Sequence, residues 1–307
     1  MNALTINMPD LGNYEKRRTK EMKWKGRTRS TNVEDRRGAG GLGMGGKGTI
    51  ASGLGIIILI VYMLLGGDLS QFNEQSQVIN PDEGTSYTQT AEEQELSEFV
   101  AVVLADTEYV WGDIFVSENL EYQKPTLVLY SGYVQSACGN AESSTGPFYC
   151  PEDSKVYIDL SFYEQLKTTF NAPGDFAMAY VIAHEVGHHV QNQLGVMGEV
   201  QQLQTQLSQV EYNEMSVRLE LQADYLAGVW AHYAEDMKIL EQGDIEEALN
   251  AASAIGDDRI QKQSQGYIVP DSFTHGTSAQ RMNWFMKGFE EGDLDQWDTF
   301  SVGEEDL

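Results

Sequence analysis

The chain has 307 residues and a formal net charge of −27, and this charge is distributed unevenly. Residues 1–48 hold 11 Lys and Arg against 5 Asp and Glu, so the rest of the chain has a net charge of −33. An acidic domain of this kind repels nucleic acid and anionic lipid, because binding either requires positive charge that neutralises phosphates. Nucleic acid is therefore excluded as a partner.

The basic N-terminal segment shows no sustained hydrophobic period. Residues 1–37 are polar and residues 38–48 are rich in glycine, so neither stretch is expected to hold a fold alone. We predict that residues 1–48 form a basic tail with a glycine-rich tether.

The most apolar stretch of the chain is Ile50–Leu65, which carries no charge. With its flanks it covers 49–67, close to the roughly 18–20 residues that a spanning helix needs, so a transmembrane helix is predicted. A buried core helix is less favoured because no face is polar. A cleaved signal peptide is less favoured because the preceding basic segment is too long and no small-residue cleavage site follows.

The excess of Lys and Arg before this helix predicts the orientation of the chain in the membrane. It places residues 1–48 in the cytoplasm and the acidic part outside. The prediction is a single-pass protein of the inner membrane with an exported, periplasmic domain.

The chain after the apolar run divides into a polar linker at 68–90 and a folded domain at 91–307. Apolar residues recur at helical spacing from about residue 91. Short strand-like runs are Thr126–Tyr130 and Val156–Leu160. Further helices are expected at Phe162–Phe170, Phe176–Leu194, Val200–Asp236, Asp244–Gln263 and Ser278–Glu291. The predicted fold class is α+β, mostly helical, with a small sheet.

Cys138 and Cys150 are the only cysteines in the chain. Both fall on the predicted exported side, an oxidising compartment in which disulfides persist. A zinc ribbon would need four ligands at tight spacing, so a Cys138–Cys150 disulfide is favoured over metal binding.

The segment His184-Glu185-Val-Gly-His188 lies in a run of helix formers without proline. His184 and His188 are separated by four residues, so both imidazoles project from one helix face and can reach one Zn²⁺ at about 2.0–2.1 Å. Glu185 lies beside them, where it can take a proton from the attacking water without binding the metal. A chance pattern is less favoured, because the chain has only five histidines and apolar residues surround these two.

The residues around this motif limit the type of zinc site. His189 points roughly 100° away from His188, so a packing or hydrogen-bonding role is expected for it. The metzincin continuation is excluded, because Gln191 and Leu194 stand where that class has Gly and His.

A second pair of residues at helical spacing, Glu220 and Asp224, supplies candidates for the rest of the site. Glu220 can be the third zinc ligand, while Asp224, one turn on, can accept the outer N–H of a ligating histidine and fix its ring. The alternative is an acidic helix face in solvent, which the apolar neighbours of the two acids disfavour. If Glu220 is not the ligand, Asp224 or Glu214 is the next candidate.

Several stretches are similar to the bacterial family of putative neutral zinc metallopeptidases, and the likeness spans nearly the whole chain. They are Met22–Arg27, Asn32–Arg37, Phe148–Pro151, Val156–Leu160, His184–Gln191, Arg218–Gly228, Thr274–Gly276, Gln280–Arg281 and Trp284–Phe285. The resemblance implies a single-pass envelope protein with a zincin-like catalytic domain and a gluzincin-like site. In that site His184, His188 and Glu220 bind zinc and Glu185 is catalytic. Tyr225 stands where relatives often have Cys, which does not affect these ligands.

The predicted function is zinc-dependent hydrolysis of a protein or peptide substrate in the cell envelope. Val156–Leu160 is the candidate strand against which the substrate main chain lies. The alternative is a non-catalytic, zinc-containing envelope protein that binds or holds other proteins. A closed structural site would use four protein ligands, whereas three cluster here. The sequence does not indicate an oligomeric state.

His275 is a second catalytic candidate, carried by a loop-like stretch before the last predicted helix. A zinc peptidase needs a donor aimed at the oxyanion, and an imidazole on a loop near the metal can serve. The Thr274-His275 pair followed by Arg281 is also similar to an arrangement in membrane-associated gluzincins. The alternatives are a helix-capping or packing role, or a fourth zinc ligand. His232, between Trp230 and Tyr233, is read as structural.

Overall fold

The computed structural model describes residues 21–38 and 89–307. The predicted transmembrane helix at 49–67, the tether before it and residues 68–88 of the predicted linker lie outside the described residues. No helix within the two described ranges combines the length and the apolar character that a bilayer crossing requires.

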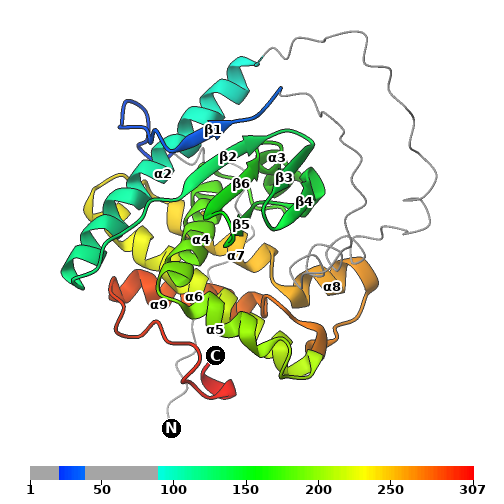
Figure 1. Cartoon of the computed structure of the whole chain (residues 1–307). Helices are drawn as coiled ribbons and strands as arrows, with labels where there is room; N and C mark the ends of the chain where they lie inside the picture. The colour runs from blue at the N-terminus through cyan, green and yellow to red at the C-terminus, as the bar shows by residue number, and fades with distance from the viewer. Residues whose placement is uncertain (1–20, 39–88) are drawn as a thin grey trace.

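A four-stranded mixed sheet forms one layer of the domain, with strand order β1-β2-β6-β5 (Figure 1). β1 (Val33–Asp35), β2 (Thr126–Tyr130) and β6 (Lys155–Asp159) are parallel, and β5 (Phe148–Cys150) runs antiparallel to β6. The central strands β2 and β6 consist mainly of buried side chains, as expected for a sheet covered on both faces.

The sheet order corrects the predicted position of the substrate strand. Val156–Leu160 overlaps β6, but β6 pairs with β2 on one side and β5 on the other. An inner strand has no edge to offer a peptide, so that prediction is wrong. β5 is the terminal strand at this end of the sheet.

Helices make up most of the described chain, and the predicted α+β class with a small sheet is confirmed. They are α2 (Ala91–Ser117), α3 (Phe162–Thr168), α4 (Asp175–Gln193), α5 (Val196–Leu203), α6 (Gln209–Asp236), α7 (Asp244–Ala254), α8 (Asp257–Gln265) and α9 (Ser278–Glu291), with short 3-10 turns η3 (Ser143–Thr145), η4 (Pro270–Ser272) and η5 (Glu304–Asp306).

Two predicted helices are each split in the structure. The stretch 200–236 divides into α5 and α6, because Ser208 caps α6 through a reciprocal hydrogen-bonded pair with Glu211. The stretch 244–263 divides into α7 and α8 at Gly256, whose backbone is extended. A Cβ at Gly256 would lie 2.4 Å from the backbone nitrogen of Ser278, so the break allows a close approach to the start of α9.

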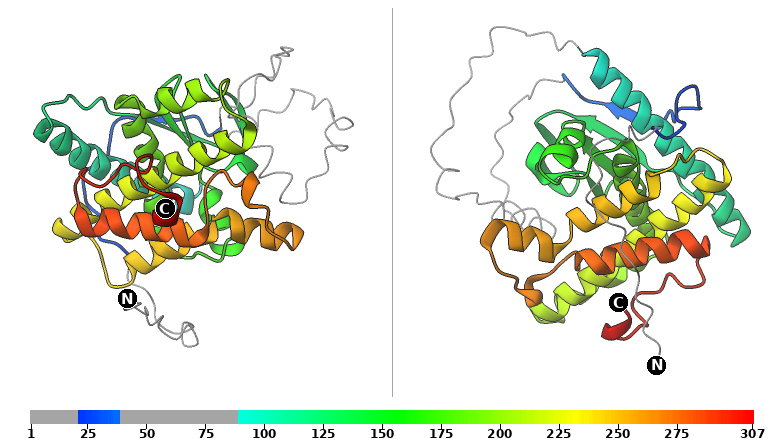
Figure 2. Two further views of the ribbon diagram at one scale, coloured as in Figure 1. Left: turned by 90° about the horizontal axis from the view of Figure 1, so that it is seen from below. Right: turned by 180° about the vertical axis from the view of Figure 1, so that it is seen from behind.

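Residues 21–38 pack against the domain. β1 pairs in parallel with β2, and β1 lies alongside α2 in the views of Figure 2. Met22 and Trp24 are 2% and 7% exposed, and the Trp24 ring meets Phe99 of α2 edge to face at 5.6 Å. Burial of two large apolar side chains makes this segment part of the hydrophobic core.

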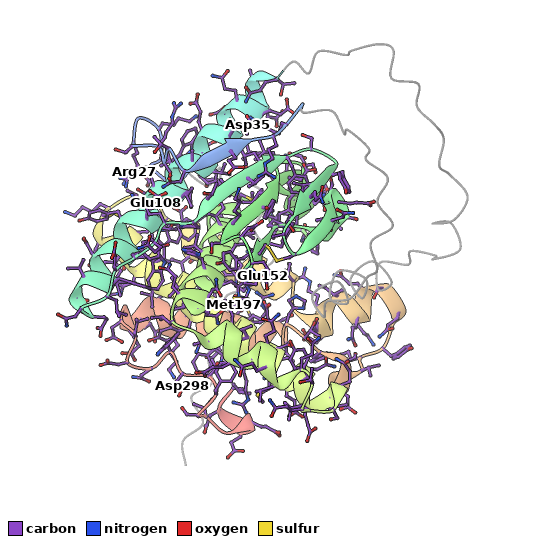
Figure 3. The ribbon with its side chains drawn as sticks, viewed as in Figure 1. Arg27, Asp35, Glu108, Glu152, Met197 and Asp298 are labelled. Carbon is purple, nitrogen blue, oxygen red and sulfur yellow. A yellow bond between two sulfur atoms is a disulfide. The ribbon has the colours of Figure 1, made fainter. Side chains whose placement is uncertain are left out.

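Polar contacts also fix residues 21–38 to α2. Arg27 Nη2 lies 2.6 Å from Asp106 Oδ1, and Glu108 accepts hydrogen bonds from Ser30 and Asn32. Figure 3 shows Arg27 and Glu108 on this side of the domain. The prediction that residues 1–48 form a separate tail is wrong for residues 21–38, because acidic residues far along the sequence match their positive charge.

Helix α4 lies at the centre of the domain, between the sheet and the layer of α6 and α9 (Figure 1). Its side chains are buried from Phe176 to Gln191, all round the helix. A helix of this kind belongs to the interior of a domain, and polar groups on it need partners there.

Two glycines allow α6 and α9 to pack closely. A Cβ at Gly228 would lie 2.0 Å from the Phe285 carbonyl oxygen, and one at Gly288 would lie 2.0 Å from that of Tyr225. The close packing brings Arg281 of α9 beside Asp224 of α6, with Arg281 Nε 2.8 Å from Asp224 Oδ2.

The predicted Cys138–Cys150 disulfide is confirmed, with a Cα–Cα distance of 5.8 Å. It joins the turn between β3 (Tyr133–Ser136) and β4 (Gly139–Glu142) to strand β5. The β3–β4 hairpin is therefore covalently tied to the end of the four-stranded sheet.

Candidate metal centre

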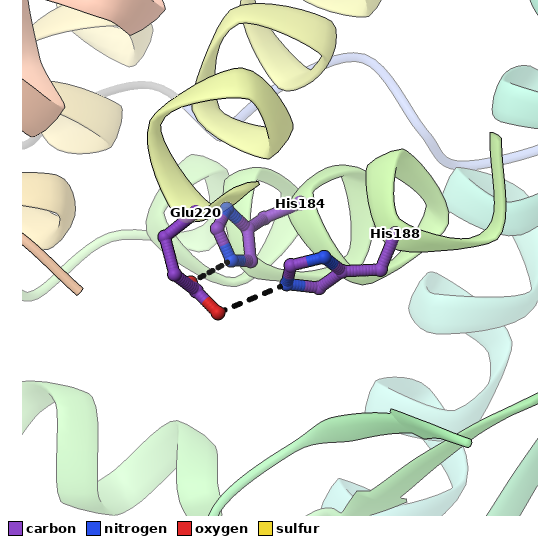
Figure 4. A group of neighbouring side chains, drawn as sticks. All are labelled: His184, His188 and Glu220. Carbon is purple, nitrogen blue, oxygen red and sulfur yellow. Dashed lines mark hydrogen bonds and ion pairs between the residues drawn. The ribbon is translucent and has the colours of Figure 1, made fainter. Parts of the chain in front are cut away.

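Helices α4 and α6 bring three potential metal ligands together (Figure 4). His184 Nε2 lies 3.1 Å from Glu220 Oε2, and His188 Nε2 lies 3.4 Å from Glu220 Oε1. One ligand atom from each of the three side chains lies within 4.8 Å of the other two. Both imidazoles are buried, as expected from the interior position of α4.

The donor set fits a zinc ion. Two imidazole nitrogens and one carboxylate are donors that zinc takes in catalytic sites, where three protein ligands leave one position for water or substrate. Burial opposes the charged form of Glu220, but His188, His275 and the hydrogen bond from His184 hold the pKa of its carboxyl well below its ordinary value. Glu220 is therefore ionised, which is the form that binds a metal.

Asp224 orients the ring of His184. Burial favours the neutral imidazole, but the Asp224 carboxylate raises the pKa of His184 to about 9. His184 Nδ1 donates to Asp224 Oδ1 at 2.8 Å, which leaves Nε2 directed at Glu220. Metal binding would replace the proton that His184 Nε2 shares with Glu220.

Tyr180 and Arg281 complete the surroundings of Asp224, and sequence reasoning assigned neither of them a role. The Tyr180 hydroxyl donates to Asp224 Oδ1 at 2.5 Å, and Arg281 donates to both carboxylate oxygens at 2.8 and 3.0 Å. Asp224 is fully buried, so these donors offset the cost of burying its charge. Tyr180 lies one turn before His184, a spacing that could have pointed to it.

Gln191 orients the ring of His188, as Asp224 orients the ring of His184. His188 Nδ1 donates to Gln191 Oε1 at 2.8 Å, and Gln191 Nε2 donates to Leu219 O at 2.7 Å and Gln222 Oε1 at 3.0 Å. The amide therefore fixes the imidazole tautomer and ties α4 to α6. In the sequence, Gln191 served only to exclude the metzincin class, and this hydrogen-bonding role was not predicted.

A cavity of about 460 Å³ opens onto the metal centre. Glu185 and His275 line it together with His184, His188 and Glu220. The remainder of the wall is mainly apolar and includes Phe148, Phe162, Phe170, Val181, Ile255 and Ile260. The candidate catalytic side chains therefore share one pocket with the candidate ligands.

Glu185 is buried in this pocket, 8% exposed. Burial raises the pKa of its carboxyl, and the nearby His188 and His184 partly oppose that rise. A carboxylate whose pKa is raised toward neutral pH is a stronger base than one in water.

His275 is held by the carboxylate of Asp257, the first residue of α8. Asp257 Oδ2 accepts the backbone N–H groups of Thr274, His275 and Gly276 at 2.7, 2.6 and 3.1 Å. Burial favours a neutral imidazole, but Glu220 and Asp257 raise the pKa of His275. A protonated imidazole on a fixed loop is a hydrogen-bond donor.

The other two histidines lie outside the metal group of the described residues. His189 contacts the Tyr149 hydroxyl at 3.0 Å and the Gln123 carbonyl oxygen at 2.6 Å. His232 Nδ1 donates to the carbonyl oxygen of Phe289 at 2.8 Å. Both contacts agree with the structural roles expected for these residues.

Comparison with known proteins gives matches over most of the chain. A sequence profile for the family described as “Putative neutral zinc metallopeptidase” matches residues 22–300. “Uncharacterized protein YpfJ” of Escherichia coli strain K12 is 52% identical over 285 residues, which are 91% of this chain and 99% of that protein. “Uncharacterized protein Rv2575” of Mycobacterium tuberculosis is 46% identical over 194 residues, 60% of this chain and 64% of that protein. No solved structure gives a significant match.

Proposed function

The chain belongs to the family described as putative neutral zinc metallopeptidases, and on this basis we propose that it hydrolyses peptide bonds with zinc as its cofactor. The observation that carries the proposal is the convergence of two imidazoles and one carboxylate in a pocket that Glu185 also lines. Zinc-dependent hydrolysis requires these three kinds of group: ligands, a base and space for a substrate.

Each side chain has a distinct proposed role. His184, His188 and Glu220 would hold the zinc, which when bound would polarise the scissile carbonyl and lower the pKa of water to about 7. Glu185 would take the proton of the attacking water and return it to the leaving amine. His275 would donate a hydrogen bond to the oxygen that becomes negative as water adds.

The position of β5 supports a protein or peptide substrate. β5 is the terminal strand of the sheet, and its residues Phe148 and Tyr149 line the pocket. We propose that the substrate main chain pairs with β5, because an edge strand offers main-chain donors and acceptors to an extended peptide. The apolar side chains of the pocket would then receive a side chain of the substrate.

The other candidate, a zinc-containing protein that binds other proteins without cleaving them, has less support. A closed structural zinc site uses four protein ligands. Within the described residues, the metal group at this centre comprises His184, His188 and Glu220, and a cavity reaches it.

A cleavage assay on the full-length chain tests the proposal. Zinc-loaded protein in detergent is incubated with a mixture of peptides, and the products are identified by mass spectrometry. Cleavage should stop when a chelator removes the zinc and return when zinc is restored. Absence of cleavage by zinc-loaded protein, or cleavage that persists after metal removal, would contradict it. A shortened chain that begins at residue 66 is unsuitable for this assay, because it lacks β1.

Replacement of His275 by alanine tests its proposed role. The variant should keep its zinc and its fold but lower kcat by about 10²–10³, the range for loss of one oxyanion donor. His232→Ala is the control, because His232 contacts Phe289 and does not line the pocket. Steady-state kinetics and zinc analysis are measured together. Unchanged kcat would reject the role, and loss of zinc would make His275 a ligand.

The compartment stays a prediction from the sequence. We propose that the domain acts in an exported, oxidising compartment, whereas its attachment to the inner membrane through residues 49–67 stays a prediction from the sequence. The Cys138–Cys150 disulfide supports this compartment, since disulfides persist where thiols are not kept reduced.

A further inference from the structure

A second group of potential metal ligands lies at the beginning of two helices. Asp175 is the first residue of α4, and Asp244 and Glu247 lie in the first turn of α7. One carboxylate oxygen from each residue lies within 4.8 Å of the other two. Asp244 and Glu247 are 0% and 5% exposed, and none of the three lines the pocket of the zinc centre.

Each carboxylate accepts a main-chain hydrogen bond. Asp175 Oδ2 accepts from the Met22 N–H at 2.9 Å, Glu247 Oε2 from the Phe176 N–H at 3.1 Å and Asp244 Oδ2 from the Glu241 N–H at 2.8 Å. These contacts, together with the positive ends of two helix dipoles, favour negative charge here.

The second oxygen of Asp244 is an independent sign of a ligand. Asp244 Oδ1 is buried and has no hydrogen-bond partner among the described residues. Buried polar atoms almost always have partners, and a buried carboxylate oxygen without one loses its hydration. A cation that binds Oδ1 would restore that interaction.

The surroundings of Asp175 and Asp244 oppose the ionisation of both carboxyl groups. Burial and the nearby Asp244 raise the pKa of Asp175 to about 7, and burial raises that of Asp244 to about 6. Without a cation, ionised carboxylates at this separation repel one another.

Gly174 makes room for the cluster. A Cβ at this position would lie 2.1 Å from the carboxyl carbon of Glu247, and the backbone φ is +124°. Any other residue would therefore clash with Glu247 and adopt an unfavourable backbone conformation. The glycine allows the Glu247 carboxylate to reach the start of α4.

We propose that Asp175, Asp244 and Glu247 form a second cation site, which takes a hard divalent ion and best fits calcium. All donors are oxygen, which calcium and magnesium prefer and zinc does not require. Calcium accepts carboxylates in one- or two-oxygen modes with flexible geometry, whereas magnesium demands a regular octahedron. The ion would link α4, which carries His184 and His188, to α7 and to the segment at Met22. Its role is structural and is independent of hydrolysis.

The first experiment measures calcium binding by full-length protein that carries zinc and has been freed of calcium. The buffer has a pH above the pKa values of Asp175 and Asp244. Isothermal titration with CaCl₂ and elemental analysis after dialysis should show one calcium in addition to the zinc. Calcium should raise the Tm by several degrees, because a ligand that binds only the folded state stabilises it. Absence of bound calcium and of any shift in Tm would overturn the proposal.

Two variants separate a cation site from a helix-capping cluster. Asp244→Asn should bind calcium at least about tenfold more weakly, because the charge of the ligand set falls. Without calcium it should be at least as stable as the parent, since it removes a like charge yet keeps an acceptor for the Glu241 N–H. Glu246→Gln, an exposed neighbour in the same turn of α7, should behave as the parent. Parent-like calcium affinity in Asp244→Asn, or its destabilisation with and without calcium alike, would also overturn the proposal.

Discussion

Replacement of Glu185 by glutamine is expected to remove peptide hydrolysis while zinc stays bound. Glutamine keeps the size and polarity of the side chain but cannot accept the proton of the attacking water, and loss of a general base typically costs about 10²–10⁴ in rate. Zinc should stay, because Glu185 is not among the three side chains whose ligand atoms converge. Steady-state kinetics and zinc analysis of the purified variant measure both effects.

Glu152→Gln is the matched control for this variant. Glu152 also lines the pocket, but it is exposed, and Figure 3 labels it beside the region of Met197. Its replacement should leave kcat nearly unchanged. Glu152 is solvated and lies outside α4, the helix that places Glu185 beside His184 and His188. Parent-like turnover in Glu185→Gln would show that another group is the base.

Replacement of Glu220 by alanine is expected to abolish tight zinc binding, and hydrolysis with it. The variant removes the one carboxylate that faces both His184 Nε2 and His188 Nε2. Two imidazoles alone make an incomplete set for zinc, which takes three protein ligands in catalytic sites. Elemental analysis and a competition titration with a coloured zinc chelator measure the loss.

Glu214→Ala is the control for the Glu220 variant, because Glu214 lies on the same helix but is exposed. It should bind zinc as the parent does. Full zinc occupancy in Glu220→Ala would show that Glu220 is not the third ligand. If the variant loses zinc but keeps hydrolysis, the metal is not part of the reaction.

Local helix geometry explains why the sequence could predict the residues of the candidate site. His184 and His188 are one helical turn apart, and so are Glu220 and Asp224. Each pair therefore shares one face of its helix, independently of how the helices pack. The meeting of the two faces depends on tertiary packing. The roles of Tyr180, Gln191 and Arg281 also depend on it, because Arg281 reaches Asp224 only through the close packing of α6 on α9.

The fold was predictable where hydrophobic patterns are strong. β2 coincides with the predicted run Thr126–Tyr130, and α9 with Ser278–Glu291. The strands β1 and β5 are only three residues long, too short for alternation to be visible. The helix break before Ser208 lies in a glutamine-rich stretch of good helix formers, so propensity concealed it.

The pairing of β1 with β2 restricts how the chain meets a membrane. Two strands that are hydrogen-bonded to each other in one sheet must lie on the same side of a bilayer. If a bilayer separated them, the hydrogen bonds between them would break and their main-chain groups would lose their partners. When the sheet is complete, residue 38 and residue 89 therefore lie in the same compartment. A single crossing at 49–67, with residues 1–48 in the cytoplasm and the domain outside, would require β1 to leave the sheet and expose Met22 and Trp24.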